Sequence, residues 1–232
     1  MREKRETSRL ELWAGIECTV NRVKDTYHDQ MAMGARWLGS RKADLLQEIG
    51  AKAVRVPVLW EHVRGQHGDQ WHWTQSDELL GRMRELGLRP IIGLLHHGSG
   101  PRTTSLVDPD FPQKLAEFAC AVSERYPWVT DWTPVNEPLT TARFSGLYGH
   151  WYPHDRSPSA FVQAFLCQIE GVQAAMRTIR EAVPTAMLIQ TEDLGKTTCS
   201  PGLEYQAEFE NERRWLTYDA LVGRLVPGHP VY

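Results

Sequence analysis

The chain alternates short apolar segments with longer segments whose apolar residues recur at helical spacing, and this alternation restricts its fold more than any other feature. We expect strands at residues 12–17, 53–59, 89–95, 129–135 and 186–190. The helical patterns lie at residues 41–50, 75–87, 111–126, 159–182 and 203–225. Because the apolar runs are too short for helices, the alternation is typical of βαβ units and predicts a parallel sheet.

The segment 75–87 illustrates how the helix boundaries are predicted. Ser76 can cap the start of this helix, and Asp77 and Glu78 suit its positive end. Gly87 is well placed to end it, because glycine adopts the left-handed backbone common after a helix.

Two α/β architectures fit this pattern, an open doubly wound sheet and a closed (β/α)8 TIM barrel. The open nucleotide-binding form is disfavoured, because neither a G-x-G-x-x-G nor a G-x-x-x-x-G-K-[ST] segment occurs. Chemically promising residues instead follow several different strands: Glu17, Trp60, His96, Glu137 and Glu192. A barrel collects its active site in this way, at the carboxyl ends of its strands. We therefore predict an incomplete TIM barrel of about the first five βα units, with residues 12–232 as one domain after a charged lead-in at residues 1–11.

Composition excludes several classes of partner. A formal net charge of -3 without basic clusters argues against nucleic-acid and membrane surfaces, and no apolar run is long enough to span a bilayer. The first residues are charged, so we expect no secretory signal and a cytoplasmic protein. The 4 cysteines are scattered without a C-x-x-C pair, which argues against disulfides and a zinc site. We expect no metal and no cofactor.

The segment 131–138 (DWTPVNEP) carries the strongest chemical signal. It places Glu137 directly after a strand, and Pro138 cannot continue the ladder because it has no N–H. Breaking a glycosidic bond requires one protonated carboxyl group and one ionised carboxylate. Neighbouring side chains on a strand face opposite ways, so Asn136 and Glu137 can share a pocket only if the backbone turns there.

This segment resembles the acid/base motif of family 1 glycoside hydrolases, usually written T-x-N-E-P, with Thr133 one position earlier than in the family. Residues 94–97 (LLHH) end the third strand where the family has a sugar-contacting histidine. Residues 53–57 (AVRVP) resemble the second strand, whose arginine supports the catalytic carboxylates. Residues 146–153 (GLYGHWYP) resemble the loop that follows the acid/base residue.

The resemblance implies a retaining β-glycosidase of the β-glucosidase type that acts on a β-glycoside. Glu137 would be the general acid and then the base, and Asn136 would bind the hydroxyl next to the reacting carbon. His96 would bind a neighbouring hydroxyl, and Arg55 would orient the carboxylates from beneath. Glu17 would also touch the sugar, although the family's usual glutamine-containing pattern is not reproduced there. The second histidine, at position 97, is predicted to face away from the pocket.

The family's nucleophile is a glutamate on the seventh strand, in an E-N-G-like segment that this chain does not contain. Glu192 follows the fifth strand, only one strand from Glu137, and is not expected to be the nucleophile. We therefore expect the isolated chain to be inactive or nearly so, with desolvation alone raising the pKa of Glu137. Open barrel edges would favour a complementing C-terminal polypeptide or self-association.

Three hypotheses remain open. The first is the N-terminal part of a retaining β-glycosidase, including the kind fused to a sugar-nucleotide (dTDP-4-dehydrorhamnose) reductase, which residues 12–23 resemble. The second is a non-catalytic sugar-binding remnant. The third is an α/β interaction domain in which the N-E-P segment is coincidental.

Overall fold

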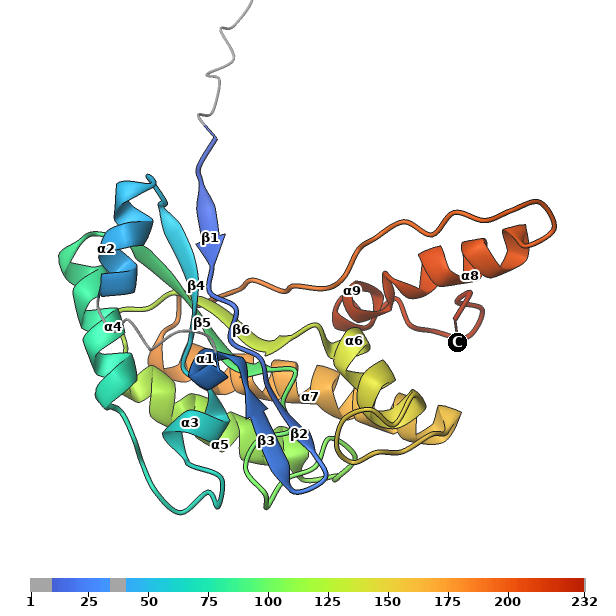
Figure 1. Ribbon diagram of the computed structural model, residues 1–232, viewed down its shortest axis with the longest axis horizontal. Coiled ribbons are helices and arrows are strands. Elements are labelled where there is room, and N and C mark those ends of the chain that lie inside the picture. The colour runs from blue at the N-terminus through green and yellow to red at the C-terminus, as the bar shows by residue number, and fades with distance from the viewer. Residues whose placement is uncertain (1–9, 34–40, 232) are drawn as a thin grey trace, which may run out of the picture.

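The sheet determines where every candidate residue lies. The computed structural model describes residues 10–33 and 41–231. Its main sheet is parallel and contains, in spatial order, β1 (Trp13–Gly15), β4 (Ala53–Pro57), β5 (Arg89–His96), β6 (Asp131–Asn136) and β7 (Met187–Leu188) (Figure 1). The spatial order follows the chain order, so each crossover steps in the same direction, as in a barrel. A doubly wound sheet would reverse direction in its middle. The predicted α/β fold, an incomplete (β/α)8 barrel, is confirmed.

The last strand is shorter than the prediction for residues 186–190. Only Met187–Leu188 pairs with β6. Beyond it, two backbone bonds, from Ile189 N to the Trp132 carbonyl (2.8 Å) and from Glu137 N to the Thr191 carbonyl (3.3 Å), are joined by side-chain bonds. Thr133 Oγ1 donates to the Ile189 carbonyl (2.6 Å), and Gln190 Nε2 donates to the Val135 carbonyl (3.0 Å). A local apolar pattern does not encode such side-chain bonds, and the strand ends early.

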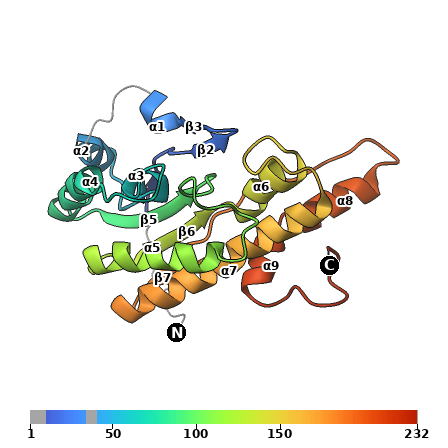
Figure 2. The same ribbon diagram turned by 90° about the horizontal axis from the view of Figure 1, so that it is seen from below.

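Four long helices pack outside the sheet, as expected for βα units: α2 (Arg41–Glu48), α4 (Thr74–Glu85), α5 (Phe111–Arg125) and α7 (Pro158–Ala182) (Figure 2). The core between helices and sheet is apolar and closed. Trp132 on β6, Phe111 and Leu115 on α5 and Ile179 on α7 are all fully buried in one cluster. The indole N–H of Trp132 is satisfied by the Val129 carbonyl (3.1 Å), which removes the cost of burying it.

Two helix predictions are wrong in detail. Helix α4 begins at Thr74, so Ser76 lies inside its first turn and does not cap it. The Ser76 hydroxyl donates to the Trp73 carbonyl (2.9 Å), a local bond that competes with capping. The single helix expected at residues 203–225 is two helices, α8 (Glu204–Arg213) and α9 (Leu216–Leu221). An extended segment leads from the sheet to α8 and α9; α9 lies beside α6 and α7, and α8 lies farther from the sheet (Figure 1).

Short elements beyond the carboxyl ends of the strands were not predicted. They are the hairpin of β2 (Val20–Val23) and β3 (Thr26–Asp29), then α1 (Gln30–Met33), α3 (Trp60–Val63), α6 (Pro138–Ala142) and the π-helical turn η1 (Arg143–Leu147). The hairpin reaches the loop after η1, where Tyr152 N donates to the Arg22 carbonyl (2.8 Å). These elements surround the edge of the sheet at which the candidate residues lie.

The predicted charged lead-in, residues 1–11, lies mostly outside the described residues, because residues 1–9 are not described, and nothing tests the division into this lead-in and one domain at residues 12–232. It stays a prediction. Among residues 10–33 and 41–231, no helix combines the length and apolar character needed to cross a bilayer.

Ser157 caps the longest helix, α7, and provides a test of the local structure. Its hydroxyl accepts a hydrogen bond from Ala160 N (3.1 Å), satisfying a helical N–H that would otherwise have no partner. We expect Ser157→Ala to lower the free energy of unfolding by about 1 kcal/mol. Ser157→Asp, which restores an accepting oxygen, should recover most of it. Urea denaturation measures both, and equal loss in the two variants would contradict this role.

Candidate functional site

The candidate site lies where β5 and β6 end side by side. His96 is paired in register with Asn136 as the last residue of each strand. The next residues, His97 and Glu137, both have left-handed backbones, with φ of 57° and 46°. A non-glycine residue in this region turns the chain sharply, so consecutive side chains no longer alternate between the faces of the sheet. The turn required for Asn136 and Glu137 to share a pocket is therefore present.

Arg55 on β4 fixes the amide of Asn136. Its Nη1 donates to Asn136 Oδ1 in a very short contact and to Thr191 Oγ1 (3.0 Å), and that hydroxyl donates in turn to Asn136 Oδ1 (2.9 Å). The resemblance implied that Arg55 orients carboxylates from beneath. Its direct contacts are instead with Asn136 and Thr191, and it reaches Glu137 only through its charge, which favours the ionised carboxylate.

Glu137 is 27% exposed, and its surroundings favour the protonated acid. Burial raises the pKa of its carboxyl group above the ordinary value, and the negative charges of Glu192 and Asp193 raise it further. The expectation that only desolvation would act is therefore wrong. The segment after β7 brings two carboxylates toward Glu137, although it contributes little to the sheet.

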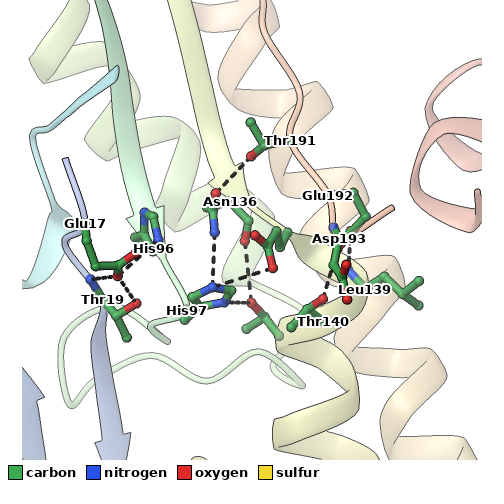
Figure 3. Close-up of polar contacts among 12 residues, drawn as sticks. Glu17, Thr19, His96, His97, Asn136, Leu139, Thr140, Thr191, Glu192 and Asp193 are labelled. Atoms are coloured by element: carbon green, nitrogen blue, oxygen red, sulfur yellow. Dashed lines mark hydrogen bonds and ion pairs between the residues drawn. The ribbon is translucent and has the colours of Figure 1, made fainter. Parts of the chain in front are cut away.

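Glu192 is held firmly in place beside helix α6. Its carboxylate accepts hydrogen bonds from Leu139 N (3.0 Å) and Thr140 Oγ1 (3.1 Å) of α6 (Figure 3). It also accepts one from Thr217 Oγ1 (2.7 Å) of α9, so the segment after β7 is linked to both helices. These bonds hold it as a fixed negative neighbour of Glu137.

His96 is deeply buried and neutral. Its Nδ1 lies 3.2 Å from Cys18 Sγ, and its Nε2 lies 3.7 Å from Glu17 Oε1. Burial lowers the pKa of His96 to about 3, with help from the neighbouring His97 and Arg55. Burial likewise raises the pKa of the Cys18 thiol to about 12, so it keeps its proton and is no nucleophile at neutral pH.

Glu17 lies at the exposed rim of the same site. Both the backbone N–H and the hydroxyl of Thr19 donate to its Oε1 (3.0 and 2.7 Å) (Figure 3). Partial burial alone would raise the pKa of Glu17, but the bonds from Thr19 and the nearby histidines outweigh it and lower the pKa. Glu17 is thus an ionised acceptor within reach of His96.

His97 lies in the site, and the prediction that it faces away is wrong. Its Nε2 is 3.2 Å from Asn136 Nδ2 and 3.7 Å from Glu137 Oε2, and its Nδ1 is 3.0 Å from Thr141 Oγ1. The alternation rule fails because its own left-handed backbone bends the chain. The one available signal was a second histidine directly after a strand-end histidine. Burial lowers the pKa of His97 to about 4, so it is neutral at pH 7.

In the described part of the chain, no cluster of three or more His, Cys, Asp or Glu side chains could hold a metal ion. A cavity of about 510 Å³ lies elsewhere, after β4, and is lined in part by Asp29, Glu61 and His62. It includes none of the residues gathered around Glu137.

The comparisons identify the fold. No protein-family profile matches the chain, and no curated protein matches its sequence. Among solved structures, the chain is similar to a β-glucosidase from Thermotoga maritima in complex with deoxynojirimycin, with a TM-score of 0.66, 18% identity, and 75% of this chain and 42% of that chain covered. It is similar to the same organism's family 1 β-glucosidase, with a TM-score of 0.65, 17% identity, and 75% and 41% covered. The chain thus spans about two fifths of the length of these enzymes and shares the fold of that part.

Proposed function

We propose that this site binds the sugar of a β-glycoside and that Glu137 is the group that donates a proton to the departing oxygen. The observation that carries the proposal is a half-buried carboxyl group with a raised pKa at a strand end, directly after Asn136. A proton donor must be protonated in a site where a carbohydrate can reach it, and both burial and nearby negative charge favour that state. The fold of the β-glucosidases supports the same reading by analogy.

Each remaining residue has a proposed task. The neutral His96 offers a ring N–H to a sugar hydroxyl, with the carboxylate of Glu17 beside it as an acceptor. Asn136, its carbonyl oxygen held by Arg55, directs its N–H groups into the site, where the hydroxyl next to the reacting carbon would lie. Arg55 thus acts through Asn136.

Hydrolysis also requires an ionised carboxylate on the opposite side of the bond. Glu192 already accepts four hydrogen bonds and lies beside helix α6, which begins directly after the acid. We therefore assign the nucleophile to further barrel strands, such as a complementing polypeptide would supply, and expect this chain by itself to bind sugar without cleaving it. The engaged state of Glu192 also favours the second candidate function, a sugar-binding module without catalysis.

Binding of an imino sugar tests what the two candidate functions share, which is sugar binding at this site. We expect deoxynojirimycin, which one of the similar β-glucosidases holds, to bind this chain. His96→Ala should weaken that binding about tenfold, because one hydrogen bond in a buried site is lost. His67→Ala, at an exposed loop position, is the matched control and should change nothing. Isothermal titration calorimetry measures all three. Equal affinity for His96→Ala and the unaltered chain would refute the site.

A further inference from the structure

His97 has no task in the proposed function, yet it contacts both Asn136, the last residue of β6, and Glu137, the next residue. The orientation of its partner is settled by donor and acceptor chemistry. Arg55 can only donate hydrogen bonds, so the atom of Asn136 that faces it must be the carbonyl oxygen, Oδ1. The amide nitrogen Nδ2 is then the atom that faces His97 Nε2 at 3.2 Å.

The amide in turn settles which ring nitrogen of His97 carries the proton. Asn136 Nδ2 is a donor, so His97 Nε2 must accept and cannot bear a hydrogen. A neutral imidazole has one N–H, which must therefore be at Nδ1. There it donates to Thr141 Oγ1 (3.0 Å), and the Thr141 hydroxyl donates in turn to the main-chain carbonyl oxygen of Asn136 (3.5 Å). Every donor in this chain of contacts meets an acceptor.

We propose that His97 is a positioning residue of this site, held as the Nδ1–H tautomer so that its bare Nε2 faces both the Asn136 amide and the Glu137 carboxyl group. Nε2 lies 3.7 Å from Glu137 Oε2. A lone pair at that place disfavours a carboxylate and favours a protonated carboxyl group, whose O–H it can accept after a small movement. An N–H at the same place would instead favour the ionised carboxylate of Glu137.

The effect of His97 on proton donation by Glu137 rests on the proposed function, but the position of the proton on the His97 ring does not. Trp151 also limits water around the ring, since the His97 and Trp151 ring centroids are 5.3 Å apart. The side chain of His97 is 13% exposed. Neutral His97 therefore has a defined proton position that can be measured without any sugar.

Nitrogen-15 NMR of the histidine side chains at pH 7, on the full chain, is the direct test. We expect His97 to show a protonated Nδ1 and a bare Nε2. In Asn136→Asp the partner becomes a pure acceptor, so the proton should move to Nε2 or both nitrogens should become protonated. A wild-type ring protonated at Nε2 would overturn the proposal, as would an unchanged pattern in folded Asn136→Asp. Should that variant not fold, the wild-type spectrum alone decides.

A pair of substitutions at His97 tests the positioning role. His97→Gln keeps an acceptor for the Asn136 amide, whereas His97→Leu removes it. We expect deoxynojirimycin to bind His97→Leu about fivefold more weakly, since one hydrogen bond to the sugar-binding amide is lost. His97→Gln should restore affinity to within about twofold. Equal affinities in the two variants would contradict positioning. Absence of sugar binding by the unaltered chain would instead refute the proposed function and leave the tautomer standing.

Discussion

Glu137→Gln is expected to lower the hydrolysis of an aryl β-glycoside by about 10²- to 10⁴-fold, the contribution usual for a general acid. Under the proposed function, the assay combines the chain with a polypeptide that supplies further barrel strands and a nucleophile. Glutamine fills the same space but cannot give a proton to the departing oxygen. The loss should be larger for a poor leaving group than for a good one, because a good leaving group departs without a proton.

Two further variants separate this role from general damage to the protein. Glu124→Gln, at an exposed position of α5, should leave the rate unchanged. Glu192→Gln removes a charge that raises the pKa of Glu137. The alkaline limit of activity reports loss of the proton from Glu137, so it should move to lower pH in this variant. A Glu137→Gln enzyme with undiminished activity toward poor leaving groups would refute the assignment.

Stability should depend on pH through Glu61, a buried glutamate outside the proposed machinery. It lies on α3, is 4% exposed, and accepts a hydrogen bond from Gly100 N (2.8 Å). Its other carboxyl oxygen is buried, with no hydrogen-bond partner among the described residues. Burial, opposed only in part by backbone hydrogen bonds, raises the pKa of Glu61 to about 7. The folded state therefore favours the protonated acid.

A pKa higher in the folded than in the unfolded chain means that stability is greatest at low pH. The contribution of Glu61 is complete below the unfolded value, near 4.5, and is lost as the pH rises through about 7. Between pH 5 and pH 8 the loss should amount to about 2–3 kcal/mol. The glutamine in Glu61→Gln stays neutral at every pH, so the variant does not lose this stability. The unfolding free energy of the variant minus that of the wild type should therefore increase by about 2–3 kcal/mol between pH 5 and pH 8.

Comparing the two proteins at each pH removes the effects of other groups. His96 and His97 have lowered pKa values, and their contributions are lost as the pH falls, which opposes the trend from Glu61. Because both proteins contain these histidines, their effects cancel in the difference. Urea denaturation at pH 5 and pH 8 gives the values. A difference that does not change with pH would show that Glu61 titrates normally.

The sequence allowed the parallel sheet and four of its crossover helices to be predicted, because apolar periodicity is a local signal. It also placed His96, Asn136 and Glu137 at strand ends, and the register of β5 and β6 brings the first two side by side. Since parallel strands end at a common edge, strand order alone was sufficient to predict that His96 and Asn136 lie side by side.

Tertiary contacts decided what the sequence could not predict. His97 enters the site because of a left-handed backbone that no residue pattern indicates. Glu192 approaches helices α6 and α9 through bonds from Leu139 and Thr217, residues far from it in the chain. The resemblance to family 1 enzymes suggested a role for Arg55, but only the geometry identified Asn136 as its direct partner.

The most direct test is a carbon-13 NMR titration of the Glu137 carboxyl group in the full chain. We predict a midpoint above the ordinary glutamate value of 4.5 that falls in Glu192→Gln, together with a shift of the Glu137 signal when deoxynojirimycin is added. A midpoint at or below 4.5 with no response to the sugar would contradict the account, because Glu137 would then be an ordinary ionised carboxylate.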